Sequence, residues 1–589
     1  MRHHPRPARR RRLAPLTVAA VLGLSLTACT PSSRSASTPA SQAAPLDAAA
    51  GDAVDAPHGM VVSASAIASR VGRDVLAAGG NAVDAAVATG FALAVTYPVA
   101  GNIGGGGFMV IRFPDGRATS FDFREMAPKA ATPEMFLDST GAYSSKIHHD
   151  SHRSVGVPGT VAGFALAHRQ YGRTPFARLV DPAVRLADSG FAAPAGLARS
   201  LASFVKNVPE YPATVAAFSK GGVPYAVGER IRQPDLARTL ARIRDRGQDG
   251  FYRGETARLL AEDMRRNGGL ITEADLAAYV AKERAPIRGS YRGYEIISMP
   301  PPSSGGVALV EMLNILEGFD LAAARRDSVR YVHLLVEAMR RAFVDRARHL
   351  ADPDFAAPPV ARLTSKEYAA RLRATIDTMR ATVSEPAQVA ERAESQETTH
   401  YSVVDASGMA VSVTYTLESG YGLGAVVPGA GFLLNNEMGD FNGKPGLTDT
   451  TGLIGTQPNL ARPAKRMLSS MTPTIVAKDG RLVAVVGSPG GRTIINTVLQ
   501  VVLNLIDGGM SVEDAVRAPR LHHQWLPDRI SAERDALSPA TVAALERMGH
   551  RVRTGGGQGT AHSIAVDART GARRGAPDRR DTDAGAAGY

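Results

Sequence analysis

Two runs of strand-forming residues on either side of a short polar turn constrain this chain more than any other feature. Residues 398–404 (Thr-Thr-His-Tyr-Ser-Val-Val) and 411–416 (Val-Ser-Val-Thr-Tyr-Thr) flank a turn that contains Gly408. Such runs around a polar turn predict a β-hairpin. Residues 366–397 hold many Arg, Glu and Ala, which predicts a helix that passes into a polar, exposed segment. The hairpin therefore starts where the chain is open to cleavage.

A hydroxyl residue at the start of this hairpin gains a chemical role if the chain is cut in front of it. A new α-amino group has a reference pKa of about 7.7–8, so it can accept the proton of a hydroxyl near neutral pH. Thr398 or Thr399 would then be a nucleophile that is activated by its own amine. The alternative is that both threonines are only β-prone residues at a strand start.

The N-terminus is typical of a targeting segment. Six arginines precede an apolar stretch, residues 13–28, that is too short to span a membrane as an ordinary helix. We therefore expect a signal peptide over residues 1–28. Residues 26–29 (Leu-Thr-Ala-Cys) resemble a bacterial lipobox, and Cys29 is the only cysteine of the chain. This excludes an internal disulfide and favours lipidation of Cys29; the alternative is ordinary signal cleavage.

Composition separates a tether from a globular remainder. Residues 29–57 are mainly Ser, Thr, Ala, Pro and Asp, which predicts a solvated linker without a core. The chain as a whole is 44% hydrophobic and 21% charged, an ordinary globular composition, and its length allows a large core or two packed lobes. The net charge of +12 includes the six N-terminal arginines. The remaining excess is spread out and does not indicate nucleic-acid binding.

A glycine-rich stretch follows two predicted helices, residues 64–78 and 82–95. Residues 101–107 contain five glycines and lead into a predicted hairpin that ends at Phe123. No Gly-Lys-Ser/Thr follows, so the stretch favours close backbone packing over a phosphate-binding loop. Arg124 comes directly after the hairpin, where its guanidinium can bind a carboxylate through two hydrogen bonds. The alternative is a salt bridge at the rim of the fold.

A histidine-rich segment and a long helical region occupy the middle of the chain. Residues 148–152 (His-His-Asp-Ser-His) have a metal-binding composition. They lack helical i, i+4 spacing and a partner Cys, so we expect no metal site there. Residues 160–350 predict mainly helices. In the clearest one, residues 328–350, apolar residues form one face and Arg and Glu the other.

A second glycine pair stands between a predicted strand and a predicted helix. A hairpin over residues 474–486 leads to Gly-Ser-Pro-Gly-Gly at 487–491, and a helix is expected at 493–505. In such a setting two backbone N–H groups can point at one developing oxyanion. Val486 replaces the first glycine of a nucleophile elbow, so Ser488 is not expected to be a nucleophile.

Five motifs together resemble bacterial γ-glutamyltransferases (γ-glutamyl transpeptidase, glutathione hydrolase). In chain order they lie at residues 123–128, 398–404, 435–438, 468–471 and 487–491. The resemblance covers about residues 58 to 575. It implies an α+β fold, the four-layer αββα sandwich of N-terminal-nucleophile hydrolases. It also implies a proenzyme that cleaves itself into a large subunit, 58–397, and a small catalytic subunit, 398–589, which build the sandwich jointly.

The resemblance implies a catalytic role for each of four residues. The cut would fall between Glu397 and Thr398, and Thr398 would be the nucleophile because it stands two residues before the family's His. It would form a γ-glutamyl enzyme from glutathione or related donors, and water or an amino-acid or dipeptide acceptor would resolve this intermediate. Gly490 and Gly491 would stabilise the oxyanion, and Thr416 would orient the nucleophile. No cofactor is implied.

The resemblance also implies a pocket for the α-carboxylate and the α-ammonium of the γ-glutamyl group. The expected carboxylate ligands are Arg124, Ser469 and Ser470. The expected ammonium ligands are Glu418, Glu437 and Asp440. This chain departs from the family pattern twice. Glu418 stands where some members have Asn, and Thr451 stands where an aromatic lid residue would be expected.

Two other functions remain open. A glutaryl or cephalosporin acylase of the same fold is the first, although Asp440 favours a donor with an ammonium group. The second is an unprocessed lipoprotein that binds γ-glutamyl peptides without turning them over. In each case we expect export to the periplasm or cell envelope, with the membrane reached only through a lipid on Cys29.

Overall fold

The computed structural model describes residues 46–47, 51–385, 398–446, 449 and 455–589. The expected signal peptide, Cys29, Glu397 and Thr451 lie outside these ranges. All the elements below belong to one unit, Ala43–Tyr589. Within the described residues, we find no helix with the length and apolar character needed to cross a bilayer.

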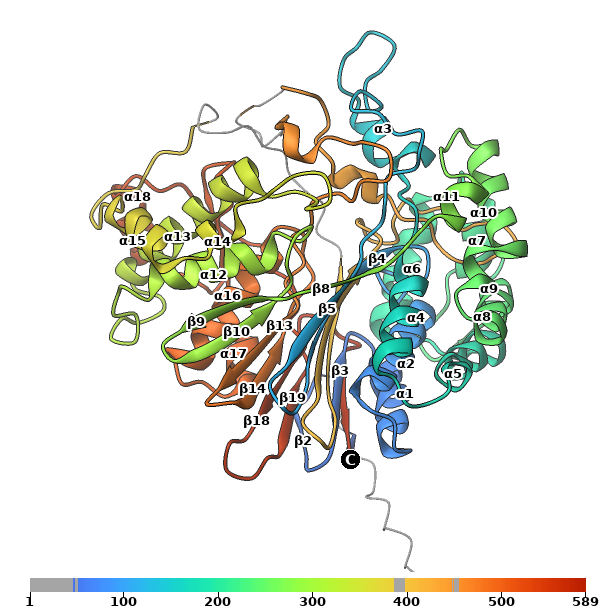
Figure 1. Cartoon of the computed structure of the whole chain (residues 1–589), viewed down its shortest axis with the longest axis horizontal. Helices are drawn as coiled ribbons and strands as arrows, with labels where there is room; N and C mark the ends of the chain where they lie inside the picture. The colour runs from blue at the N-terminus through green and yellow to red at the C-terminus, as the bar shows by residue number, and fades with distance from the viewer. Residues whose placement is uncertain (1–45, 48–50, 386–397, 447–448, 450–454) are drawn as a thin grey trace, which may run out of the picture. The chain divides into compact units, whose positions relative to one another are not determined.

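Two antiparallel sheets form the inner layers (Figure 1). The first has eight strands in the order β1-β20-β3-β11-β12-β4-β5-β8. These strands are β1 (Leu46–Asp47), β20 (Gly585–Gly588), β3 (Met60–Ser63), β11 (Thr399–Val404), β12 (Ala410–Thr416), β4 (Gly106–Arg112), β5 (Ala118–Phe123) and β8 (Lys282–Arg284). The central hairpin is therefore confirmed as β11 and β12, paired from Thr399↔Tyr415 to Val404↔Ala410.

The second sheet has seven strands in the order β2-β19-β18-β14-β13-β10-β9. They are β2 (Val54–Ala56), β19 (Arg573–Ala576), β18 (Ser563–Val566), β14 (Arg481–Val486), β13 (Thr474–Lys478), β10 (Tyr294–Ser298) and β9 (Ile287–Tyr291). Short strands form two minor sheets: β6 (Phe191–Ala192) with β7 (Arg230–Ile231), and β15 (Leu521–His522), β16 (Ile530–Ala532) and β17 (Val552–Thr554).

Helices cover the outer face of each sheet, which gives the expected four-layer αββα sandwich (Figure 1). On the eight-stranded sheet lie α1 (Ala66–Ala77), α2 (Ala82–Thr96) and α4 (Thr160–Tyr171), with α5 (Phe176–Ser189) and α8 (Pro234–Arg246) stacked behind them. On the other sheet lie α12 (Gly305–Leu316), α16 (Thr493–Ile506) and α17 (Val512–Arg517), with α13 (Val329–His349) packed on α12. Asn81 and Asp84 form a capping box at the start of α2.

The remaining helices are short and mostly connect these layers. They are α3 (Ser145–His149), η1 (His152–Ser154), α6 (Ala195–Phe204), η2 (Val205–Asn207), α7 (Pro212–Phe218), α9 (Asp249–Tyr252), α10 (Gly254–Arg266), α11 (Glu273–Ala277), α14 (Val360–Leu363), α15 (Lys366–Ala374), η4 (Glu437–Asp440), η5 (Gln457–Asn459) and α18 (Pro539–Arg547).

Side chains of the eight-stranded sheet alternate between the helices and the other sheet. In β11, Tyr401 and Val403 pack in the core under α1 and α2. Ser402 points the other way, and its hydroxyl donates to the carbonyl of His562, beside β18. Because successive side chains of a strand point to opposite faces, Thr398 shares the side of Ser402. The residue just before β11 therefore faces the space between the sheets.

The middle of the chain, residues 160–350, is mainly helical, as predicted. Within it, residues 282–298 form the strands β8, β9 and β10, and the last two belong to the seven-stranded sheet. The polar face of α13 is buried and carries Glu337, Arg340 and Arg346. A helix can bury charged groups only where they find partners, and Arg346 finds its partners at the site described below.

Candidate functional site

Thr398 stands at the junction of two cavities. The ladder of β11 and β12 ends at Thr399↔Tyr415, and one further step along an antiparallel ladder sets Thr398 opposite Thr416. Thr398 and Thr416 line the same small cavity, and Thr398 also lines a second, larger one. Thr399 is fully buried and lines neither. Only Thr398 of the two threonines is therefore placed to meet a substrate.

The glycine pair lies where the sequence placed it, between β14 and α16. Gly490 has φ +128° and Gly491 φ +54°, backbone conformations that favour glycine. A Cβ atom on Gly490 would lie 2.3 Å from Thr493 Oγ1. Gly491 lines the small cavity and Gly490 the larger one, so the pair flanks Thr398. Ser488 is buried, and its hydroxyl donates to Pro489 O at 2.7 Å.

Arg124 lines the small cavity. Its side chain is fully buried, so the guanidinium is not at a rim. One terminal nitrogen donates to Glu437 and the other to Asp440. The second of these nitrogens also donates to Leu468 O at 3.3 Å. The structure thus brings Arg124 together with two of the predicted acids.

Carboxylates outnumber cations around this cavity. Burial opposes the charge of Arg124, but Glu437, Asp440 and Glu125 raise the pKa of its guanidinium. Burial also raises the pKa of Glu437 well above its ordinary value, and it raises the pKa of Glu125 to about 7. Among the described residues, neither buried side-chain oxygen of Glu125 has a hydrogen-bond partner. A ligand that brings an ammonium group into this cavity would relieve the repulsion between these acids.

The small cavity is tightly filled by its own side chains. Its volume is about 20 Å³, close to the room needed for one water molecule. A γ-glutamyl group is several times larger. The Arg124 contacts with Glu437 and Asp440 must therefore rearrange before such a group can enter.

The predicted Ser469 and Ser470 lie in the same cavity and are held by residues that the sequence analysis missed. Arg346 of α13 donates to Ser470 Oγ at 3.0 Å and to Ser304 Oγ at 2.9 Å. Ser304 in turn donates its backbone N–H to Ser469 O at 2.7 Å. The only sequence signal for Arg346 was its place on the face of a long helix that carries Arg and Glu.

Glu418 also lines the small cavity, directly after β12. Its backbone is in the left-handed region, with φ +79°, and its N–H donates to Thr416 Oγ1 at 2.9 Å. One carboxylate oxygen accepts from Ser419 Oγ at 3.1 Å, and the other lies 3.3 Å from His149 Nδ1. His149 was not predicted as a site residue.

The three histidines of residues 148–152 have three different partners. His148 contacts Met438 O at 3.2 Å, and His152 lies 3.3 Å from Asp263. His149 faces Glu418. Only His149 therefore connects this segment to a carboxylate of the small cavity.

The second cavity opens on the other side of Thr398 and is much larger, about 470 Å³. Gly490, Tyr97 and Ser200 line it together with charged residues from the C-terminal segment. Among these, burial raises the pKa of Asp581 to about 7. The nucleophile candidate thus lines both a narrow acidic pocket and a wide cavity.

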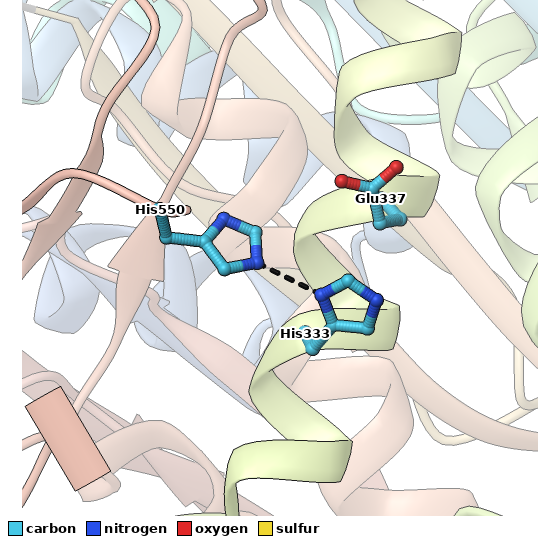
Figure 2. A group of neighbouring side chains, drawn as sticks. All are labelled: His333, Glu337 and His550. Carbon is cyan, nitrogen blue, oxygen red and sulfur yellow. Dashed lines mark hydrogen bonds between the residues drawn. The ribbon is translucent and has the colours of Figure 1, made fainter. Parts of the chain in front are cut away.

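Figure 2 shows another group of titratable residues, His333 and Glu337 on α13 with His550 after α18. Their ligand atoms lie within 4.8 Å of one another. The ring nitrogens of the two histidines are 2.8 Å apart, a hydrogen-bond distance, whereas two imidazoles on one zinc ion would hold them about 3.3 Å apart. Glu337 accepts hydrogen bonds from Arg341 and Thr382. We interpret this group as a buried polar network.

Comparisons with known proteins agree with this geometry. Residues 68–588 match the family model described as gamma-glutamyltranspeptidase. The chain is 49% identical over 533 residues to the glutathione hydrolase proenzyme of Escherichia coli (strain K12), which covers 90% of this chain and 92% of that protein. It is 40% identical to the acylase ACY 1 proenzyme of Pseudomonas sp. (strain SE83), covering 84% and 87%.

A solved structure extends the likeness to the fold. The cephalosporin acylase of Bacillus halodurans superposes with a TM-score of 0.81 at 28% identity, covering 91% of this chain and 97% of that one. A family model that spans most of the chain and a relative of nearly half identical sequence establish the relationship. This chain belongs to the γ-glutamyltranspeptidase family.

Proposed function

We propose that this protein is a self-processing γ-glutamyltransferase and glutathione hydrolase whose nucleophile is Thr398. The observation that carries the proposal is that Thr398 lines both a narrow acidic pocket and a wide cavity. A nucleophile in that position can hold the acyl group of a donor on one side and release its amine on the other. The name of the E. coli relative, a glutathione hydrolase proenzyme, supports the same substrate class.

Self-cleavage comes first in this proposal. Thr398 Oγ attacks the carbonyl carbon of Glu397, the peptide C–N bond breaks, and the acyl group moves from nitrogen to oxygen as an ester. The shift frees the α-amine of Thr398, and water then hydrolyses the ester, which frees the Thr398 hydroxyl and the carboxylate of Glu397. The products are the large subunit, residues 58–397, and the small subunit, residues 398–589.

In turnover the α-amine of Thr398 takes the hydroxyl proton while Oγ attacks the γ-carbonyl of the donor. Gly490 and Gly491 donate N–H groups to the oxyanion, and one such donor typically contributes about 3 kcal/mol to the transition state. Thr416 orients the nucleophile. The leaving amine takes the proton and departs through the wide cavity. Water or the amine of an amino acid or dipeptide enters by the same route and resolves the γ-glutamyl ester.

Donor recognition follows from the two charges on the α-carbon of a γ-glutamyl group. The residues that we assign to its carboxylate are Arg124, Ser469 and Ser470. Those that we assign to its ammonium are Glu418, Glu437 and Asp440. The excess of acids around the pocket supports a donor with an ammonium group over the glutaryl group of the acylases, which lacks one. The greater identity to the glutathione hydrolase points the same way.

We further propose that the protein is exported. Residues 1–28 would be removed as a signal peptide, Cys29 would carry a lipid, and residues 29–57 would tether the enzyme in the cell envelope or periplasm. Mass spectrometry of the N-terminal peptide tests this: a diacylglycerol mass on Cys29 is expected. An unmodified N-terminus would leave only ordinary signal cleavage.

Intact mass and N-terminal sequencing of the purified protein test the central proposal. We expect two fragments, with the smaller one beginning Thr-Thr-His-Tyr, and release of glutamate from γ-glutamyl-p-nitroanilide. A single chain that binds γ-glutamyl peptides without hydrolysing them would favour the binding-lipoprotein alternative. Two fragments with glutaryl-amide but no γ-glutamyl activity would favour the acylase.

A further inference from the structure

An imidazole and a carboxylate face each other at the edge of the donor pocket. His149, the last residue of α3, places Nδ1 3.3 Å from Oε1 of Glu418. Oε1 of Glu418 and Nε2 of His149 are buried and have no hydrogen-bond partner within the described part of the chain. Glu418 lines the pocket that contains Thr398. A buried carboxylate oxygen in this position therefore has hydrogen-bonding capacity to offer a ligand.

The contact depends on a glycine of η4. A Cβ atom on Gly439 would lie 2.4 Å from His149 Nδ1 and 2.9 Å from Glu418 Oε1. No side chain can therefore be accommodated at residue 439 unless the pair moves apart. His149 and Glu418 thus pack against the backbone of η4 at Gly439, between Glu437 and Asp440, which are two of the acids of the same pocket.

The charged groups around His149 favour its protonated form. Glu418 faces it from the end of β12, Asp440 from η4 and Asp150 from the end of α3, and the ring of His148 packs on it with centroids 4.4 Å apart. Burial of His149 favours the neutral ring, but the three carboxylates outweigh it and raise the pKa. Arg124 lies beyond Asp440, to which it is paired.

We propose that His149 is a positioning residue that pairs with Glu418 and makes the affinity for the donor's α-ammonium group depend on pH. When His149 is protonated, it neutralises Glu418 and adds a positive charge against the incoming ammonium. When His149 is neutral, the donor is the only cationic partner for Glu418 among the groups that the structure describes. This inference rests on the proposed function, because it concerns the same pocket.

The proposal predicts that pH affects KM differently for two matched donors. γ-Glutamyl-p-nitroanilide and glutaryl-p-nitroanilide both have the terminal carboxylate, but only the first has the ammonium. The pH range from about 5.5 to about 8.5 includes the ordinary imidazole pKa of about 6.5 and the higher values expected for His149. As pH rises through this range, KM for the γ-glutamyl donor should fall roughly fivefold, which corresponds to a modest coupling between two sites. KM for the glutaryl donor should not fall. Titration of the Thr398 amine should alter kcat for both.

His149→Gln removes the titrating group at similar size, so the pH dependence of the γ-glutamyl KM should vanish. His152→Gln is the matched control, because His152 lies in the same segment but pairs with Asp263; it should keep the wild-type profile. Glu418→Gln tests the other partner and should also give a flat profile. The double variant should then lose no more pH dependence than either single one.

Several outcomes would overturn the proposal. The proposal is wrong if the γ-glutamyl KM keeps its pH dependence in His149→Gln. It is also wrong if the wild-type enzyme shows the same pH dependence of KM with the glutaryl donor. If His149→Gln does not process, Glu418→Gln alone decides, and a wild-type profile there refutes the pairing. Failure of the proposed function is separate, since wild-type enzyme would then cleave no γ-glutamyl donor at any pH.

Discussion

Thr398 and Thr399 are neighbours of the same type, yet the pleat of the strand gives them opposite surroundings. Thr399 is fully buried, and its hydroxyl has no hydrogen-bond partner in the described structure. Thr398 faces the two cavities. The alternation of side chains along a strand thus decides between two residues that sequence chemistry alone treats as equivalent.

The two threonines give a matched pair of variants. Thr398→Ala should leave an uncut chain without γ-glutamyl hydrolase activity, because both processing and turnover use the same hydroxyl. Thr399→Ala should still be cut and retain most of its activity. A denaturing gel and a γ-glutamyl-p-nitroanilide assay measure both results. Processing in Thr398→Ala, or its loss in Thr399→Ala alone, would contradict the assignment.

In our proposal, Asp440 distinguishes γ-glutamyl donors from glutaryl donors. In our proposal it accepts a charge-assisted hydrogen bond from the donor ammonium, which is worth about 1.5–3 kcal/mol. Asp440→Asn should therefore lower kcat/KM for the γ-glutamyl donor by roughly tenfold to a hundredfold. The glutaryl donor should lose much less, and any loss it shows measures the disturbance of Arg124. Equal losses would remove the reason to prefer γ-glutamyl donors.

At the scale of elements, the sequence predicted those helices, strands and turns that are determined by residues close together in the chain. The capped helix α2, the hairpin of β11 and β12 and the Gly-Gly turn before α16 all follow from caps, alternation and glycine. The β9–β10 hairpin, with its turn at Arg292-Gly293, was not singled out within the region that was predicted to be mainly helical. Both turn residues have positive φ. In the sequence only Gly293 indicates such a backbone conformation, because arginine rarely adopts it.

In the proposed donor pocket, contacts between residues that are distant in sequence could not be predicted. Arg124 and Asp440 could be named from motifs, but not their pairing, which joins residues 316 positions apart. Arg346 and His149 could not be named at all. Arg346 lies on the buried polar face of α13, and His149 gains its role only because η4 folds against α3. Partners that are distant in sequence leave no local pattern.

The buried polar face of α13 also anchors the segment that precedes the proposed cleavage site. Glu337 accepts hydrogen bonds from Thr382 N and Oγ1 at 3.1 and 2.5 Å, and from Arg341 at 2.6 Å. Burial alone would raise the pKa of Glu337, but Arg340, Thr382 and Arg341 lower it to about 2. A carboxyl with a depressed folded-state pKa stabilises the fold above its unfolded pKa, and this contribution is lost as pH falls through about 4.5 to about 2.

Glu337→Gln should therefore destabilise the protein at pH 7 by about 3 kcal/mol, at roughly 1.4 kcal/mol for each pKa unit. The difference from wild type should shrink as pH falls below about 4.5. Denaturant unfolding at several pH values measures this. Glu262→Gln is the control, because its exposed contacts with Arg258 and Arg266 are worth less than about 1 kcal/mol. An equal effect of both variants, or a pH-independent loss for Glu337→Gln, would contradict the account.

At the scale of the whole molecule, each sheet combines strands from both sides of the proposed cut. In the eight-stranded sheet, β11 pairs with β3 and β12 with β4, while β20 lies on the other side of β3. In the seven-stranded sheet, β10 pairs with β13 and β19 with β2. Separation of the two proposed subunits would expose both cores and leave ladder hydrogen bonds unpaired.

The cut enzyme should therefore behave as one folded body. In gel filtration at nanomolar concentration, where weakly associated subunits would separate, both fragments should co-elute at the mass expected for one large and one small subunit. Rising denaturant should separate them only in the transition in which activity and secondary structure are lost, because the shared sheets make dissociation and unfolding the same event. Fragments that separate in buffer while each keeps its secondary structure would contradict this. Such a result would mean that the interleaved strands do not hold the two halves together.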